Sequence, residues 1–368
     1  MQRTSKPLWS RALASGAIGL AMLAGAWSGP AAAVDFSGKT VEFTIPFNTG
    51  GGSDAWARFF SPLMHEALPG KPTVQVKNVP GGGSTTGTNQ WEARAKPDGL
   101  EILGTSGSTQ FPYLLGDPRV KYEYKHWPAV LATPTGGVVY LNPELGVKQA
   151  ADIKKIQDKK MAYLSQGATS LDLVPLLSFE LLGLQVDPIF GAKGRGDGRL
   201  AFERGEVNID YQTTSAFLKN VKPLVDAGKA QPLFSWGALD ESGKLVRDPT
   251  FPDLPHMGEV YETVHGKKPS GPAWNAWMAF FSAGFAAQKM VFLPENTPQE
   301  IVDAYSAAFQ KIVSAPDFKQ KAAAAIGTYP QGVGKAAEAA KQVAINVSAE
   351  DKQWVLDWLK RRFNVEIK

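Results

Sequence analysis

Along most of the chain, short segments with the apolar pattern of a strand alternate with longer segments that have the pattern of a helix. Short apolar or alternating runs predict strands at residues 41–45, 74–76 and 100–103, each followed by a loop rich in glycine, serine and threonine. Helical stretches follow the first two loops, at residues 55–68 and around Trp91. Strands that alternate with helices are typical of an α/β protein with a parallel sheet.

The same pattern restarts after Asn142-Pro143, which indicates a second sheet. Three further strands are predicted, at residues 161–164, 186–190 and 207–211. An apolar helix at 171–182 follows the first of them. The other two lead into a glycine-rich loop at 191–198 and a polar loop that begins at Gln212. From residue 297 onward the pattern becomes helical.

The first residues have the composition of a cleavable export signal. Arg3, Lys6 and Arg11 precede an uncharged apolar run at residues 12–27, which leads to the small residues 31–33. The run is shorter than the roughly 20 residues that a membrane-spanning helix needs. We therefore predict a Sec-type signal peptide, cleavage after Ala33 and localisation in the periplasm.

Removal of residues 1–33 from the 368-residue chain leaves 335 residues. Chains longer than about 250–300 residues usually divide their core, so two lobes are expected. The signal holds three basic and no acidic residues, so the formal net charge of +4 falls to +1 in the mature chain. That balance disfavours a nucleic-acid partner. The chain has no cysteine, so disulfides, thiol chemistry and cysteine metal sites are excluded.

The loops at the predicted strand ends are the candidate binding elements. A loop that leaves a parallel strand and enters a helix presents free N–H groups and the positive end of the helix dipole, which suits an anion. One such loop is more often a tight turn with a helix cap, here Ser53 or Asp54. Five of them recur across two predicted lobes, so a carboxylate between the lobes could meet donors from both sides.

Two larger side chains join these loops as candidates. Arg195, in the loop at 191–198, could form a charge-assisted pair with a ligand carboxylate, and a solvated loop charge is the open alternative. Tyr211 precedes a polar loop and could form one wall of a pocket, although aromatic residues in such positions are more often core.

Catalytic and metal-binding patterns are missing from the sequence. The glycine loops lack the lysine of a P-loop and the spacing of a dinucleotide fingerprint, and the four histidines are scattered. Residues 105–108 do not supply the nucleophile elbow of a serine hydrolase. We therefore predict no enzyme activity, no cofactor and no metal.

Several short motifs follow one another in a characteristic order. They are Ile45-Pro46-Phe47 with Gly50-Gly51-Gly52-Ser53-Asp54, then Asn78-Val79-Pro80-Gly81, Lys96-Pro97-Asp98-Gly99 and Pro252-Asp253-Leu254-Pro255. In this order and spacing the chain resembles the substrate-binding receptors of tripartite tricarboxylate transporters, the TctC or Bug family. The resemblance covers nearly the whole mature chain. It implies a two-lobed periplasmic binding protein of type 2, the Venus flytrap fold, with a mostly parallel sheet in each lobe and a ligand cleft between them.

The resemblance also implies lobe boundaries and a ligand site. Residues 34–141 and 277–368 would form one lobe, and residues 142–276 the other. In the family, the loops that match 47–54 and 165–170 hold one ligand carboxylate, partly through water, and other strand-end loops line the same cleft. With Arg195 added, the candidate ligand-binding residues are Phe47, Asn48, Thr49, Gly51, Gly52, Ser53, Asp54, Ser84, Thr85, Thr86, Thr105, Ser106, Ser108, Ser165, Gly167, Thr169, Ser170, Arg195, Tyr211 and Gln212.

One position departs from the family in a way that bears on the ligand. Many relatives read Phe-Asp-Asn where this chain reads Tyr211-Gln212-Thr213, and that aspartate helps amino-acid-binding members hold an ammonium group. Gln212 is neutral, so an amino-acid ligand is disfavoured. Arg195 replaces a small residue, and a second carboxylate could meet it. These differences favour a dicarboxylate, a tricarboxylate or an aromatic acid.

The resemblance implies a monomeric receptor that closes on its carboxylate ligand and delivers it to a two-component membrane permease. Two alternatives remain open at the level of sequence. The same lobes could serve a membrane histidine kinase as a ligand sensor. A secreted enzyme would need a nucleophile and its base at the cleft, and the loops offer hydroxyls and amides without a base.

Overall fold

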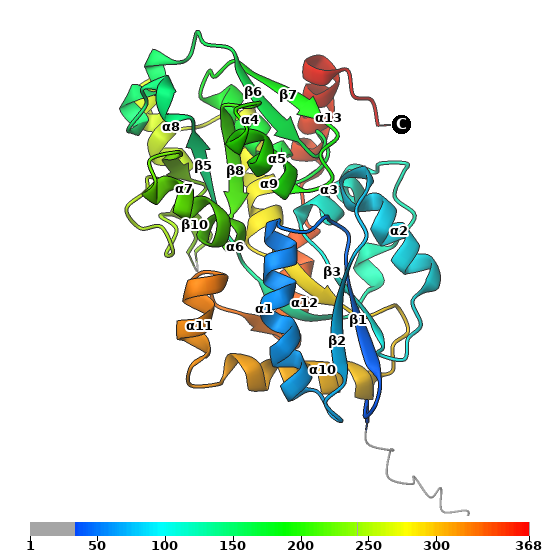
Figure 1. Ribbon diagram of the computed structural model, residues 1–368. Coiled ribbons are helices and arrows are strands. Elements are labelled where there is room, and N and C mark those ends of the chain that lie inside the picture. Colours follow the sequence, from blue (N-terminus) through cyan, green and yellow to red (C-terminus); the bar gives the residue numbers. More distant parts are fainter. Residues whose placement is uncertain (1–33, 241, 368) are drawn as a thin grey trace, which may run out of the picture. The chain divides into compact units, whose positions relative to one another are not determined.

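The computed structural model describes residues 34–240 and 242–367, so the predicted signal peptide and its cleavage site lie outside the described residues. The first sheet has six strands in the order β13-β4-β12-β3-β1-β2 (Figure 1). Its strands are β1 (Thr40–Ile45), β2 (Thr73–Asn78), β3 (Glu101–Gly104), β4 (Ala129–Thr133), β12 (Lys289–Phe292) and β13 (Gly332–Val333). The strands predicted at 41–45, 74–76 and 100–103 are thereby confirmed.

Four strands of this sheet, β1 to β4, run in one direction, and β12 and β13 run in the other. The helices that follow its strands are α1 (Gly52–Ala67), α2 (Thr85–Arg94), α3 (Gly107–Leu115), α10 (Gln299–Val313), α11 (Phe318–Ala325) and α12 (Lys335–Ala344). Successive side chains of a strand point to opposite faces. Accordingly, Val291 of β12 joins the buried cluster of Trp56 and Phe309, whereas Met290 and Phe292 join that of Trp91.

The second group of strands follows the first along the chain. Strand β5 lies between β8 and β9 and is antiparallel to both, while β6 and β7 form a parallel pair. The strands are β5 (Gly137–Leu141), β6 (Met161–Ser165), β7 (Val186–Phe190), β8 (Ile209–Thr213) and β9 (Gln231–Ser235), with a short hairpin of β10 (Ala238–Leu239) and β11 (Leu245–Val246). The helices are α4 (Leu173–Leu181), α5 (Arg195–Glu203), α6 (Thr214–Ala216), α7 (Lys222–Asp226) and α8 (Met257–His265).

Two long helices complete the fold, α9 (Pro272–Phe285) and α13 (Ala349–Phe363). Helix α9 packs against α3, α4, α12 and α13, and its Trp277 shares a buried cluster with Trp358 of α13. Short turns of other helix types are η1 (Gly82–Ser84), η2 (Tyr124–His126), η3 (Pro143–Leu145), η4 (Ala150–Lys155) and η5 (Phe217–Val221). The lobe boundaries inferred from the sequence stay a prediction, since helices such as α9 contact elements on both sides of them.

Two loop predictions were wrong. The segment 191–198 was expected to be a loop, but α5 begins at Arg195. A loop was also expected from Gln212, but Gln212 and Thr213 extend β8 by pairing with Val138 and Gly137 of β5, and α6 begins at Thr214. In both cases tertiary contacts lengthen an element beyond what the local pattern indicates.

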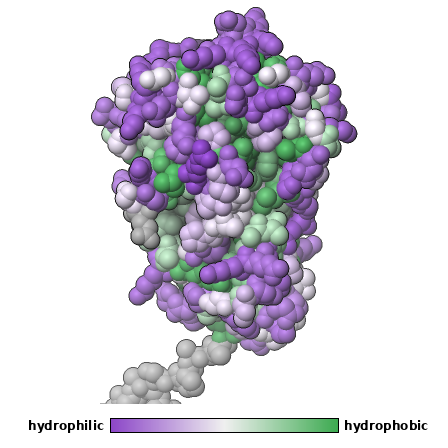
Figure 2. Space-filling view, turned by 90° about the vertical axis from the view of Figure 1, so that its left-hand side faces the viewer, coloured by the Kyte–Doolittle hydropathy of each residue, from purple (hydrophilic) through white to green (hydrophobic). Residues whose placement is uncertain are grey.

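The surface of the described residues is largely polar. Hydrophilic residues cover much of the face in Figure 2, and apolar atoms interrupt them around its middle. The exposed large hydrophobic side chains are those of Ile189, Phe190, Leu200 and Val343. Within residues 34–240 and 242–367, no helix has both the length and the hydropathy to cross a membrane.

A buried polar cluster joins the two groups of strands beside the segment that connects β4 to β5. The Tyr329 hydroxyl donates to the carboxylate of Asp248 at 2.7 Å and lies 2.7 Å from Oγ1 of Thr214. Thr214 in turn accepts from the backbone N–H of Gly136 at 3.2 Å. A Cβ at residue 136 would lie 1.7 Å from Asp248, so this crossing requires glycine.

The Asp248 carboxyl makes the stability of this junction dependent on pH. Burial raises its pKa from 3.8 to about 6, and the hydrogen bonds from Tyr329 and Thr250 offset only part of that effect. The folded state therefore favours the protonated acid, and this contribution is present below pH 4 and lost as the pH rises through 6. We expect Asp248→Asn to raise the free energy of unfolding at pH 7.5 by on the order of 2 kcal/mol and to change it little at pH 4. Urea unfolding at both pH values measures this, and an equal effect at the two would contradict it.

Candidate functional site

Segments from the two groups of strands meet directly at the ends of β1, β3, β6, β7 and β8. Asn48, after β1, donates to the Asp197 carboxylate through its side chain and to the Lys193 carbonyl through its backbone N–H. The Ser108 hydroxyl accepts from the backbone N–H of Leu171 at 3.0 Å. The Ser215 hydroxyl donates to the carbonyl of Gly52 at 2.9 Å. The structure is therefore a closed arrangement of these loops.

Glycine allows the closest of these contacts. A Cβ on Gly52 would lie 1.9 Å from Oγ1 of Thr213, the last residue of β8 in the other group of strands. A Cβ on Gly194 would lie 2.0 Å from Oδ1 of Asn48. A side chain at residue 194 would displace the Asn48 amide, and one at residue 52 would displace Thr213 or move the two segments apart. The glycine-rich composition noted in the sequence thus serves contact between the two groups of strands.

A small buried space, the inner cavity, lies where these loops meet. Its volume is about 20 Å³, which suits about one water molecule. Its lining comes from both groups of strands and consists of Phe47, Gly51, Gly52, Ser53, Ser106, Ser108, Gln166, Leu171, Arg195, Thr213, Gln288 and Lys289.

Unpaired polar atoms are concentrated around the inner cavity. Four of its lining residues carry a buried side-chain atom without a hydrogen-bond partner among the described residues: Gln166 Nε2, Arg195 Nε, Thr213 Oγ1 and Gln288 Oε1. An unsatisfied buried polar group costs about 1–3 kcal/mol. Such a cluster is typical of a site that is completed by a ligand or ordered water. Helix α1 begins at the same place, and its first-turn N–H groups lack intrahelical partners.

Lys289 is the second basic side chain of this cavity, besides Arg195, and sequence reasoning missed it. Its side chain is buried, and its ammonium nitrogen lies 3.3 Å from Oγ of Ser53. Burial lowers its pKa from 10.5 to about 7. The prediction considered loops after parallel strands, but Lys289 is the first residue of the antiparallel β12 and pairs with Thr133 at the end of β4. An antiparallel strand begins where its parallel neighbours end. The available signal was a lone lysine at the start of an apolar run.

Arg195 lies in a buried network of hydrogen bonds and ion pairs. Its guanidinium forms ion pairs with Asp172 and Asp210, and it donates to the carbonyl of Leu164 at 2.6 Å. The rings of Tyr163 and Tyr211 lie 4.9 and 4.7 Å from its central carbon. The solvated loop charge left open by the sequence is therefore excluded. Both terminal nitrogens have protein partners, and only Nε is left unpaired beside the cavity.

Tyr211 and Gln212 support this network rather than line the inner cavity. The Tyr211 hydroxyl donates to Asp172 at 3.0 Å. The Gln212 amide donates to the Arg195 carbonyl at 2.7 Å and to Asp210 at 3.0 Å. Both side chains are fully buried and, through these hydrogen bonds, fix the position of Arg195.

The predicted hydroxyl residues divide by location. Ser53, Ser106 and Ser108 line the inner cavity. Ser84 is buried one layer away and donates to the carbonyl of Ser108 at 3.1 Å. Thr86 is exposed. Thr49 is also exposed, and Thr105 is buried with its hydroxyl unpaired. Three further hydroxyl groups hold the loops in shape: Ser165 donates to Asp172, Ser170 to the carbonyl of Gly167, and Thr85 to the carbonyl of Gly82. The carboxylate of Asp54 does the same by accepting from Gly50 and Arg58.

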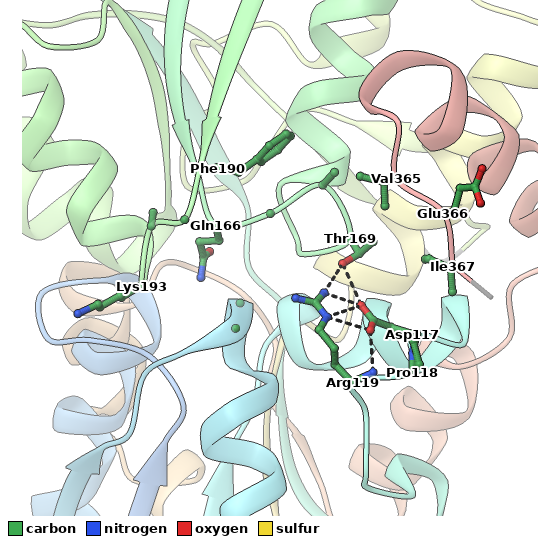
Figure 3. A pocket seen from close by; sticks show the side chains of 16 residues that line it. Asp117, Pro118, Arg119, Gln166, Thr169, Phe190, Lys193, Val365, Glu366 and Ile367 are labelled. Carbon is green, nitrogen blue, oxygen red and sulfur yellow. Dashed lines mark hydrogen bonds and ion pairs between the residues drawn. The ribbon is translucent and has the colours of Figure 1, made fainter.

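A larger space, the outer cavity, has a volume of about 600 Å³ and shares Gln166 with the inner cavity. Figure 3 shows Arg119 and Asp117 as an ion pair on one side of it, with Thr169 hydrogen-bonded to both. Its lining is Gly82, Gly83, Asp117, Pro118, Arg119, Gln166, Gly167, Ala168, Thr169, Phe190, Gly191, Ala192, Lys193, Val365, Glu366 and Ile367. Thr169 and Gly167 of the prediction therefore belong here.

In residues 34–240 and 242–367, no group of three or more histidine, aspartate or glutamate side chains is arranged to hold a metal ion. The donors around the inner cavity are instead ammonium, amide, hydroxyl and backbone N–H groups. Donors of this kind suit an oxyanion, while the unpaired amide oxygen of Gln288 accepts hydrogen bonds and needs a donor of its own.

Comparison with known proteins agrees with this architecture. The sequence pattern of the tripartite tricarboxylate transporter family receptor matches residues 58–331. The UPF0065 protein in the tcbD-tcbE intergenic region of Pseudomonas sp. (strain P51) is 24% identical over 293 residues, which is 77% of this chain and 76% of that protein.

Two solved structures show the same fold. The periplasmic binding protein BugD has a TM-score of 0.66 at 22% identity, over 89% of this chain and 98% of its own. The R. palustris protein Rpa4515 with adipate has a TM-score of 0.68 at 19% identity, over 89% and 98%. The predicted α/β, two-lobed binding-protein fold is thus confirmed. Because the family pattern spans most of the chain, the protein belongs to the receptor family of the tripartite tricarboxylate transporters.

Proposed function

We propose that this protein is an exported receptor that binds a small organic carboxylate in the inner cavity and delivers it to a two-component permease of the tripartite tricarboxylate type. The observation that carries the proposal is the cluster of unpaired buried polar atoms around a cavity with a buried lysine and the start of α1. A carboxylate accepts hydrogen bonds from all the donors in this set.

The adipate in the related Rpa4515 structure supports a dicarboxylate as the ligand class. The family supports the permease as partner and the periplasm as the location. Arg195, Tyr211 and Gln212 then act as a scaffold that fixes the wall facing α1, and the first contacts come from residues 51–53, Ser106, Ser108 and Gln166.

The size of the inner cavity implies movement. A space of about 20 Å³ cannot enclose even a four-carbon acid, so binding requires the loops to separate further than in this closed structure. The adjoining outer cavity offers about 600 Å³ for the rest of a ligand whose carboxylate enters the inner one. Closure around the ligand would then create the surface that the permease recognises.

Thermal unfolding against a ligand panel tests this proposal. The purified protein is first unfolded and refolded to remove bound ligand, and then mixed with malate, adipate, citrate, benzoate and aspartate. A ligand at a hundredfold excess over its Kd stabilises the fold by about 2.7 kcal/mol, which raises Tm by about 3–6 °C. We expect this from at least one carboxylate class.

Two variants localise the effect. Gln166→Ala removes a side chain that lines both cavities and should abolish most of the shift. Thr86→Ala changes an exposed candidate that lines neither cavity and should keep it. A Tm that no acid raises would overturn the receptor proposal, and a shift from aspartate alone would overturn the inference from Gln212.

A further inference from the structure

The surroundings of Lys289 differ from those of the other buried basic side chains in the described residues. Arg195 has two carboxylate partners, and the buried Lys341 pairs with Glu338 and donates to two carbonyls. The side chain of Lys289 is buried, and the residue is only 1% exposed. Among residues 34–240 and 242–367, the one hydrogen-bond partner of its ammonium group is the Ser53 hydroxyl. A buried ammonium without an anion is strongly unfavourable. The position is therefore suited to an anion that arrives from outside.

The position of Lys289 in the fold places its side chain beside the inner cavity. Strand β12 places it between the end of β4 and the loop after β3, where the backbone N–H of Thr105 donates to the carbonyl of Met290 at 3.0 Å. Its side chain reaches Ser53 on the first turn of α1 and lines the inner cavity. A carboxylate at the α1 terminus would thus meet the lysine, the serine and the helix N–H groups together.

We propose that Lys289 is the cationic contact of the ligand carboxylate, and that it acquires a proton when the ligand binds above neutral pH. The inference rests on the proposed carboxylate-receptor function and adds a specificity-determining residue and a proton linkage to it.

The linkage follows from the two states of the lysine. Burial places its pKa at about 7 in the ligand-free protein, and an adjacent carboxylate raises that pKa. Affinity is then constant below pH 7 and falls by about tenfold per pH unit above it, until the pKa of the complex is reached. The other charged groups nearby have partners already: Arg195 holds Asp172 and Asp210, and Asp54 on α1 holds Arg58.

Isothermal titration calorimetry tests the linkage. The ligand is whichever of adipate or malate binds, titrated at pH 6.0 and 8.5 in pairs of buffers with different ionisation enthalpies. The difference in heat between buffers gives the number of protons taken up. We expect close to zero at pH 6.0 and close to one at pH 8.5, with an affinity more than tenfold weaker at the higher pH.

Three variants separate charge from packing. Lys289→Met should weaken binding at pH 6.0 by at least tenfold and abolish proton uptake at pH 8.5. Lys289→Arg keeps the charge without titrating, so any binding it retains should show no uptake. Lys341→Met replaces another buried lysine, away from the cavity, and should leave affinity and uptake as in the wild type.

The outcomes distinguish the inference from the proposed function. Binding of a dicarboxylate with no proton uptake at pH 8.5, and with Lys289→Met binding as well as wild type, would overturn the role of Lys289 and keep the receptor. A wild-type protein that binds neither acid at either pH would overturn both. Because uptake is measured on the wild type, the test does not depend on the variants folding.

Discussion

Replacement of Arg195 by methionine should lower the free energy of unfolding by about 3–5 kcal/mol, a loss typical of removing one partner of a buried ion pair. The guanidinium stands between Asp172 and Asp210, and both carboxylates are fully buried. Without it, two like charges face each other in a region that excludes water. Urea unfolding at pH 7.5 measures the loss.

Lys193→Met is the matched control for this variant. Lys193 lies two residues away in the same segment, but it is exposed and its replacement should change stability by less than about 0.5 kcal/mol. A similarly small effect of Arg195→Met would contradict the structural role. It would favour instead the direct contact with a ligand carboxylate that the sequence indicates.

The second large effect concerns closure rather than stability. Gly52→Ala should weaken ligand binding by at least tenfold, because the added Cβ would stand 1.9 Å from Oγ1 of Thr213 and hold the loops apart. We expect the ligand-free protein to tolerate separated loops, so its Tm should change little. Calorimetric titration with the identified ligand gives the affinity, and small-angle scattering of the complex reports whether closure still occurs.

A second substitution tests the proposed steric cause. Thr213→Ala removes the atom in conflict, so the Gly52→Ala/Thr213→Ala protein should recover much of the lost affinity. Failure of the double variant to bind better than Gly52→Ala would show that residue 52 acts through its backbone contact with the ligand. Wild-type affinity in Gly52→Ala itself would contradict the closed geometry.

The local pattern of apolar and polar residues was enough to predict several strands and the loops that follow them. The strand–loop–helix order is encoded in neighbouring residues, so β1, β2, β3, β6 and β7 could be predicted from it. Element ends could not, because Thr213 continues β8 only through its pairing with Gly137. Helix α1 likewise starts at Gly52, earlier than the predicted Ala55.

The roles of charged residues depended on contacts between distant segments. Arg195, Asp172 and Asp210 come from three different parts of the sequence and contact one another only in the fold. The glycine-rich residues around Arg195 give no indication of these two carboxylate partners. Lys289 comes to the cavity through an antiparallel strand more than 230 residues after Ser53. The loops that the sequence indicates for the site stay a prediction, and the lysine that we assign to the ligand carboxylate is found only in the fold.

The arrangement also separates two tasks that one arginine was expected to perform. Arg195 pairs with two buried carboxylates, whereas no carboxylate pairs with Lys289 among the described residues. A buried cation without a counter-ion gains most from a ligand carboxylate.

A crystal structure of the protein with the dicarboxylate that raises Tm most would locate the ligand. We expect one ligand carboxylate in the inner cavity, within hydrogen-bonding distance of the backbone N–H groups at Gly52 and Ser53 and of Nζ of Lys289. A ligand bound entirely in the outer cavity, with the inner lining unpaired as in the closed structure, would contradict it.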